Sequence, residues 1–191
     1  MPMLHLSQDP DADALLSEDP LALLLGMLLD QQFPMEAAFA GPWKLKDRLG
    51  HLDAATLAEM DLEQLTAAMR QTPVVHRYPA SMAGRVQDVC RHLVEHHGGR
   101  AEALWEDAAS GADLLSRLKA LPGFGEQKAK IFLALLGKQL GVQPEGWREA
   151  AGAYGEEGST RSIADVRDQD SLLAVRAFKQ EQKAAAKAAK A

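Results

Sequence analysis

The sequence is poor in cysteine and in aromatic residues, and both shortages exclude classes of protein. Cys90 is the single cysteine, which leaves no internal disulfide, four-cysteine iron–sulfur cluster or cysteine-rich zinc site. His92 and His96, one helical turn apart, either share a metal or are solvated at a helix end; the second reading is favoured, so no metal or cofactor is expected. Aromatic residues make up 5% of the chain, while Ala and Leu dominate, which predicts an all-α fold.

Long apolar stretches are also missing. The run Leu21–Leu29 is much shorter than the ~20 apolar residues that span a bilayer. The N-terminal region is acidic, whereas a secretion signal begins with basic residues. We therefore expect a cytoplasmic protein without membrane contact.

Positive charge is scarce overall but unevenly distributed. The formal net charge is −6, and residues 1–69 hold 3 basic and 12 acidic groups. Residues 70–120 hold 7 and 6, and residues 121–191 hold 11 and 9. A broad surface that neutralises phosphates is thus excluded, whereas a small basic face is compatible with the sequence.

The most informative motif is a tight turn between two expected helices. Leu121–Gly125 reads LPGFG and is followed by a helix over Glu126–Leu140. Gly123 and Gly125 allow a sharp backbone turn and leave free N–H groups at the positive end of that helix, an arrangement that binds phosphate. The alternative is a plain helix–helix turn, for which one glycine would normally be enough.

This hairpin, continued to Ala129 as LPGFGEQKA, resembles the helix-hairpin-helix base-excision DNA glycosylases (HhH-GPD). Leu28–Gln32 resembles the end of an early helix in that family, and the segment from Ser81 to Gly99 resembles the helix that leads toward the hairpin. The resemblance spans about residues 20–140 and is to a compact form without an iron–sulfur cluster.

The resemblance implies a two-lobed helical fold with the site in the cleft between the lobes. Residues 19–140 are expected to form a helical domain that contains the hairpin at 121–125. Residues 1–18 and 141–180 are expected to form a smaller lobe. The basic Ala/Lys tail, 181–191, is expected to be disordered; a DNA-contacting arm is the less favoured alternative.

Local signals predict the ends of two further helices in the larger domain. Met35–Phe39 is predicted to be a short helix that ends at Gly41-Pro42. Ser81 is predicted to cap a longer amphipathic helix that ends at His97 before Gly98.

In relatives that also cut the DNA backbone, the resemblance places a lysine nucleophile where this chain has Gln127. An amide cannot form a Schiff base with the sugar, which predicts a monofunctional enzyme that uses water. Lys128 is one residue later, about 100° round the helix, and is expected to face another direction.

The family's catalytic aspartate corresponds by position to Glu145, which follows Pro144 at a plausible helix start. Glu145 is the predicted catalytic carboxylate, with an ordinary helix-start glutamate as the alternative reading. Asp165 and Asp168 are the fallback candidates. Trp147 and Tyr154 either line a base pocket or belong to the core.

Further residues are predicted to contact DNA. Gln32, with Gln31 beside it, matches the position of the family's inserted glutamine, although a polar helix end is an equally good explanation. Tyr78 matches an intercalating wedge, and Arg77 beside it can reach a phosphate. The remaining predicted contacts come from the hairpin and the helix that follows it: Gly123, Phe124, Gly125, Gln127 and Lys128.

The resulting prediction is a monofunctional DNA glycosylase that hydrolyses the N-glycosidic bond of a flipped damaged or mismatched base. Its expected partner is double-stranded DNA that contains such a base, which would associate it with the nucleoid, and a monomer is expected. The alternative is a non-catalytic helix-hairpin-helix protein that binds lesions or unusual DNA structures.

Overall fold

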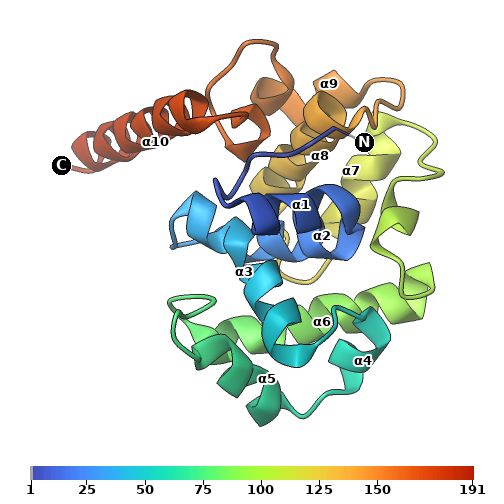
Figure 1. The fold of residues 1–191 in the computed structure, drawn as a ribbon. Coiled ribbons are helices and arrows are strands. Elements are labelled where there is room, and N and C mark those ends of the chain that lie inside the picture. The colour runs from blue at the N-terminus through green and yellow to red at the C-terminus, as the bar shows by residue number, and fades with distance from the viewer. Residues whose placement is uncertain (1) are drawn as a thin grey trace.

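The computed structural model describes residues 2–191, and within this range it contains helices and no strand (Figure 1). The all-α prediction is confirmed. The α-helices are α1 (Pro10–Glu18), α2 (Pro20–Leu29), α3 (Met35–Leu49), α4 (Ala54–Glu59), α5 (Leu62–Arg70), α6 (Pro79–His97), α7 (Gly111–Lys119), α8 (Glu126–Leu140), α9 (Trp147–Ala151) and α10 (Gln169–Ala189). The 3-10 helices are η1 (Ala101–Leu104), η2 (Gly152–Gly155) and η3 (Ile163–Asp165). No helix in the described range is long and apolar enough to cross a membrane.

Helix α2 lies at the centre of the molecule, and its residues Leu21–Leu29 are all buried. It begins at Pro20 because the Asp19 carboxylate accepts hydrogen bonds from the Leu21 and Ala22 amides, at 2.9 and 3.3 Å. Helices α1 and α3 pack against α2. The apolar run that is too short for a membrane is therefore the core helix of the fold.

Two groups of helices lie on opposite sides of α2 (Figure 1). On one side, α4 and α5 pack on α6; on the other, α7, α9 and η3 pack on α8. Helix α1 packs on α2 and α3, whereas the segment after residue 141 packs on α8. The predicted division into residues 19–140 and a second lobe of 1–18 plus 141–180 stays a prediction.

The expected end of a short helix at Gly41-Pro42 is wrong, because α3 continues through both residues to Leu49. Packing overrides the local signal here. A Cβ on Gly41 would lie 2.8 Å from Leu29 Cδ1 and 3.1 Å from Val75 Cγ1. The glycine thus lets α3 approach α2 closely, and its burial offsets the poor helix propensity of Pro42.

The start predicted at Ser81 is also wrong, by a few residues. Helix α6 begins at Pro79, where proline suits the first helical position, and it ends at His97 as predicted, with Gly98 in the left-handed conformation at φ 61°.

The disorder expected for residues 181–191 is corrected by the structure, in which α10 continues to Ala189. Alanine and lysine both favour helix, so the helix propagates beyond the last buried residue, Val175. Residues 181–191 are exposed, and α10 projects from the body of the molecule (Figure 1).

Trp147 belongs to the core and holds α9 against α8. It is 8% exposed, and its ring lies directly over Gly137, where an added Cβ would be 2.4 Å from ring carbons Cε3 and Cζ3. Of the two readings of Trp147, the structure supports the core residue.

We expect Gly137→Ala to lower the free energy of unfolding by about 1–3 kcal/mol, because the methyl group overpacks the Trp147 ring. The matched control is Gly84→Ala in α6, where an added Cβ has nothing within 4 Å. There the change is expected to stabilise the protein by about 0.4–1 kcal/mol. Urea unfolding followed by circular dichroism measures both, and equal stability of the two variants would contradict the packing argument.

Candidate functional site

The hairpin Leu121–Gly125 connects α7 to α8 and packs tightly on the end of α2. Leu121 and Phe124 are buried and hold the hairpin in the core. Gly123 has φ +81°, and a Cβ there would lie 3.1 Å from Leu28 Cδ1. This position therefore needs glycine both for its backbone conformation and for the close approach to α2. Phe124 packs in the core of the hairpin, and its predicted contact with DNA stays a prediction.

The start of α8 has an open set of backbone donors. Gly125 precedes the helix without a side-chain cap, and a Cβ there would meet nothing within 4 Å. The first amide of the helix to find a backbone acceptor is that of Ala129, which donates to the Gly125 carbonyl at 3.0 Å. The amides of Glu126, Gln127 and Lys128 are left for an anion at the positive end of the helix.

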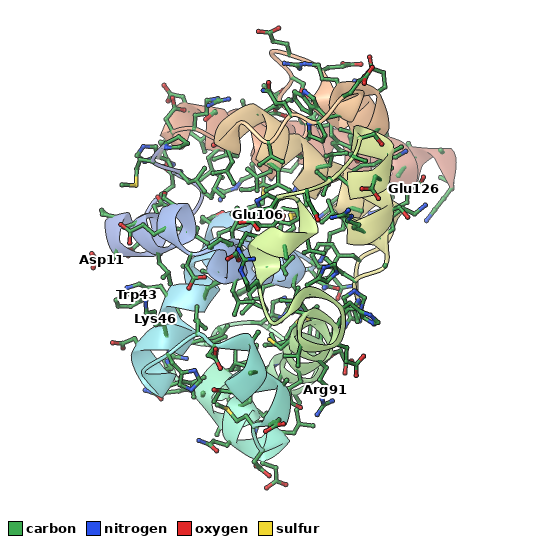
Figure 2. All side chains as sticks on the ribbon, turned by 90° about the vertical axis from the view of Figure 1, so that its right-hand side faces the viewer. Asp11, Trp43, Lys46, Arg91, Glu106 and Glu126 are labelled. Carbon is green, nitrogen blue, oxygen red and sulfur yellow. The ribbon has the colours of Figure 1, made fainter. Side chains whose placement is uncertain are left out.

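Glu126 does not cancel this positive end, because its carboxylate is paired with lysines. Its Oε1 lies 3.6 Å from Lys130 Nζ and 3.9 Å from Lys119 Nζ. The residue lies at the surface of the molecule (Figure 2). The start of α8 thus remains suited to a DNA phosphate.

The carbonyl of Leu28, near the end of α2, accepts hydrogen bonds from one nearby and one distant side chain. It accepts hydrogen bonds from Lys128 Nζ and from Gln31 Nε2, both at 2.9 Å. Gln31 Oε1 in turn accepts from Arg85 Nη1 at 2.7 Å. These bonds fix the end of α2 against α8 and α6, and we call them the Leu28 junction.

The two predicted glutamines differ in their hydrogen bonding and exposure. Gln31 is committed to the Leu28 junction, whereas Gln32 is exposed. Gln32 also has φ 52°, a conformation that is uncommon for residues other than glycine and that concentrates at functional sites. Of the two glutamines, Gln32 is therefore the one whose side chain lies at the surface, and its contact with DNA stays a prediction.

His76 joins the Gln31–Gln32 turn to the loop that carries Arg77 and Tyr78. The Tyr78 amide donates to His76 Nδ1 at 3.0 Å, so the proton sits on Nε2, which donates to the Gln31 carbonyl at 3.0 Å. Burial lowers the pKa of His76, which favours this neutral form. Tyr78 itself is 44% exposed, and the Arg77 guanidinium lies 5.6 Å from its ring. One buried imidazole thus holds both predicted probe segments side by side.

A cavity of about 1290 Å³ opens beside these segments. It is lined by residues of the α2–α3 connection, the first turns of α8 and α10. The charged residues that line it are six basic and two acidic: Arg77, Lys128, Arg161, Arg176, Lys179 and Lys183, with Asp30 and Glu36. The fold therefore gathers a locally positive cavity from an acidic chain.

Gln127 and Lys128 both line this cavity, but their side chains face different partners, the Tyr154 hydroxyl and the Leu28 carbonyl, as expected for positions about 100° apart on the helix. The cavity surrounds the first turn of α8 widely enough to reach both positions. Gln127 Nε2 donates to the Tyr154 hydroxyl at 3.0 Å, which also places Tyr154 on the cavity wall. Of the two readings of Tyr154, the structure supports the pocket residue.

Asp30 lies on the cavity wall, and its carboxyl group is not hydrogen-bonded to another described residue. It ends α2, and no residue from 2 to 191 donates a hydrogen bond to its carboxyl group. Burial raises the pKa of Asp30, while the charges of Lys179 and Lys128 act in the opposite direction. The other acidic residue of the cavity, Glu36, is ion-paired with Arg176 of α10.

Glu145 does not line the cavity among the described residues. Its side chain is exposed, and its carbonyl accepts from the Gly111 amide at 2.7 Å. The adjacent Trp147 packs on Gly137, which lies about 9 Å along α8 from Ile131, the last residue of that helix on the cavity wall. The catalytic role of Glu145 stays a prediction, to which this placement lends no support.

The two fallback aspartates have structural partners. Asp165 forms a buried ion pair with Lys138 at 2.6 Å and accepts from the Ser159 hydroxyl at 2.9 Å. Asp168 caps α10 by accepting from the Ser171 amide at 2.7 Å. Neither residue lines the cavity. Within residues 2–191 no group of three or more His, Cys, Asp or Glu side chains is placed to hold a metal ion.

Reasoning from the sequence missed several side chains of the site. It missed Asp30, the role of His76 in joining the two probe segments, and the basic residues Arg161, Arg176 and Lys179. Asp30 directly precedes Gln31 and Gln32, but no local pattern distinguishes it from an ordinary aspartate at the end of a helix. The three basic residues come from the C-terminal segment, and only the tertiary fold brings that segment to the cavity.

A helical hairpin with open amides, next to a positively lined cavity, is an arrangement suited to a phosphate-bearing ligand. The sequence matches the family model described as HhH-GPD superfamily base excision DNA repair protein over residues 25–190. The chain therefore belongs to this superfamily, whose members are DNA glycosylases, and its substrate is DNA. No curated protein matches the sequence.

Lys128 is expected to titrate far below the other lysines, because burial lowers its pKa to about 8 while the charge of Asp30 partly opposes that shift. Following lysine side-chain carbon shifts by NMR from pH 6 to 11 measures this, with Lys128→Met to assign the signal. Asp30→Asn should lower the pKa further, and Glu126→Gln, the control, should leave it unchanged.

The lowered pKa of Lys128 also determines how this residue affects stability at alkaline pH. Folding disfavours the charged amine, so the unfolded chain binds more protons between pH 8 and 10.5, and this group's contribution to stability rises with pH across that window. An ordinary pKa near 10.5 for Lys128 would contradict its placement in the cavity wall.

Proposed function

We propose that this protein is a monofunctional DNA glycosylase that hydrolyses the N-glycosidic bond of a damaged or mismatched base flipped into the cavity. The observation that carries the proposal is the positively lined cavity with Asp30 in its wall, next to the hairpin that suits a phosphate. Its volume of about 1290 Å³ accommodates a nucleotide, since sites for small molecules typically measure about 300–1,000 Å³.

The two probe segments suit the extrusion of a nucleotide. Gln32 and Tyr78 stand on either side of His76 and are both exposed. A flipped nucleotide leaves a gap in the duplex, which an aromatic ring can fill by stacking and an amide can fill by hydrogen bonding to the orphan base. Arg77, which lines the cavity beside Tyr78, is placed to hold the backbone phosphate.

Asp30 is the residue to which we assign the chemistry. As the C–N bond to the base breaks, positive charge develops on the sugar, and a carboxylate at the cavity wall stabilises it. The water oxygen bonds to C1′ while its proton passes to the Asp30 carboxylate, which then returns the proton to the departing base. A raised pKa suits the first step of this exchange, because a carboxylate with a higher pKa is a stronger base and accepts the proton of the attacking water more readily.

The monofunctional assignment rests on the side chains of the first turn of α8. Gln127 carries an amide, which cannot attack the sugar as a nucleophile. Lys128 has an amine in the cavity, but its Nζ is bonded to the Leu28 carbonyl. We assign Lys128 to holding the Leu28 junction and the charge near Asp30. For Glu145 to serve as the carboxylate instead, the segment between Gly141 and Gly146 would have to move toward the cavity when DNA binds.

The proposal is tested with duplexes that each carry one lesion: uracil, hypoxanthine, 8-oxoguanine or 3-methyladenine. Strand cleavage that appears only after alkali is expected for at least one of them. Cleavage without alkali, or trapping of a covalent complex by borohydride that Lys128→Met abolishes, would show a lyase and overturn the monofunctional assignment. Binding without cleavage of any substrate would favour the non-catalytic lesion-binding alternative.

We expect Asp30→Asn to reduce the single-turnover rate about 10²- to 10³-fold while leaving DNA affinity nearly unchanged, since the variant removes charge but keeps the shape. Glu149→Gln, an exposed position away from the cavity, is the matched control and should retain full activity. Loss of activity in Glu145→Gln with none in Asp30→Asn would return the catalytic role to Glu145.

The pH profile gives a second readout for Asp30. Because the carboxylate must be ionised to accept a proton from water, activity should fall on the acidic side as the pH drops through its pKa. That midpoint is expected above the ordinary value of 3.8, since burial raises the pKa. A rate that is independent of pH down to 4 would argue against Asp30 as the proton acceptor.

A further inference from the structure

The basic residues of α10 lie on one side of the helix and continue outward from the cavity. Their positions are spaced by three or four residues, so all of them fall within about 80° of the helix circumference. The residues of this basic stripe are Arg176, Lys179, Lys183, Lys187 and Lys190. The acidic residues of the same helix, Asp170 and Glu181, lie about 120–140° away from Arg176 on the other side.

The stripe begins inside the proposed site and ends outside it. Arg176, Lys179 and Lys183 line the cavity, and Arg176 anchors the helix to α3 through its ion pair with Glu36. Lys187 and Lys190 lie beyond the cavity, on the part of α10 that projects from the body (Figure 1). The stripe runs about 21 Å from Arg176 to Lys190.

The four lysines of the stripe form no ion pair with an acidic residue among the described residues. Residues 181–191 are exposed, and no ion pair within residues 2–191 involves Lys179, Lys183, Lys187 or Lys190. The same side of α10 carries the buried Leu172 nearer its start, so the stripe faces the side on which the helix packs against the body. A ligand at the mouth of the cavity therefore meets these amines.

We infer that α10 is a DNA-binding arm that contacts backbone phosphates beside the extruded nucleotide, without reading sequence. Regularly spaced amines without acidic partners match a polyanion, and a stripe of about 21 Å corresponds to about six base pairs along the duplex axis. This inference rests on the proposed function only in requiring DNA at the cavity mouth, because the arm adds contacts outside the catalytic cavity.

The test measures binding of the full chain, by fluorescence anisotropy, to a 24-base-pair duplex that carries a tetrahydrofuran abasic-site analogue. Each phosphate contact contributes about 0.9 to the slope of log Kd against log salt concentration. Lys183→Ala, Lys187→Ala and Lys190→Ala together should lower the slope by about 2.7 and weaken binding at least about tenfold at 0.1 M salt. Alanine keeps the helix, which circular dichroism verifies.

A control variant with the same composition separates the stripe from general charge. Exchanging Lys187 with Ala185 and Lys190 with Ala188 moves each amine about 160° round the helix, while the net charge stays constant. If the arm lies along DNA, this rotated variant loses about 1.8 from the slope. A rotated variant that binds like the unmodified protein would overturn the inference, because charge alone would then explain the binding.

The outcomes also distinguish this inference from the proposed function. An unmodified protein that binds the duplex, with both α10 variants indistinguishable from it, would overturn the arm and leave the glycosylase proposal standing. Glycosylase activity that is lost in Asp30→Asn, but retained at low salt with a reduced salt slope in the rotated variant, which leaves the lysines of the cavity in place, supports both. An unmodified protein without any DNA binding would overturn both.

Discussion

The carbonyl of Leu28 is the acceptor on which the geometry of the site depends. A helix end leaves its last carbonyls without partners, and here the two side chains that satisfy this one come from Gln31 and from Lys128, one hundred residues later. The same bonds hold the hairpin at its distance from α2 and fix the turn that presents Gln32. His76 extends this arrangement to Tyr78 through the Gln31 carbonyl. The phosphate site, the probe residues and the cavity wall are therefore parts of one hydrogen-bonded unit.

Acidic and basic side chains occupy different parts of the molecule and have different roles. Four of the 12 acidic residues in 1–69 are helix caps, in which the carboxylate satisfies free amides: Asp9, Asp19, Asp53 and Asp61. Basic side chains from α8, α10 and the loop at Arg77 converge on the cavity instead. A chain with a net charge of −6 thus presents a locally positive surface to DNA, and net charge alone is a poor guide to its partner.

Local rules predicted the parts of the site that depend on local structure. The LPGFG turn, the helix that follows it and the helix ends at Gly98 and Gly141 were readable because glycine conformations and caps act over a few residues. The same reasoning failed at Pro42, where burial of Gly41 against Leu29 outweighed a strong helix-ending signal. It also missed the basic residues that α10 brings to the cavity wall, because that helix is far away in the sequence.

By itself the sequence determined that the chain is helical, that the hairpin exposes amides at the start of α8, and that the chain carries the motif of its superfamily. Composition, capping and glycine placement act locally, so they survive without knowledge of the fold. Only the tertiary structure decided which carboxylate meets the cavity. The sequence pointed to Glu145 and not to Asp30. In the structure, packing of Trp147 on Gly137 holds the segment after α8 at one end of that helix, and the Leu28 junction holds Asp30 at the other.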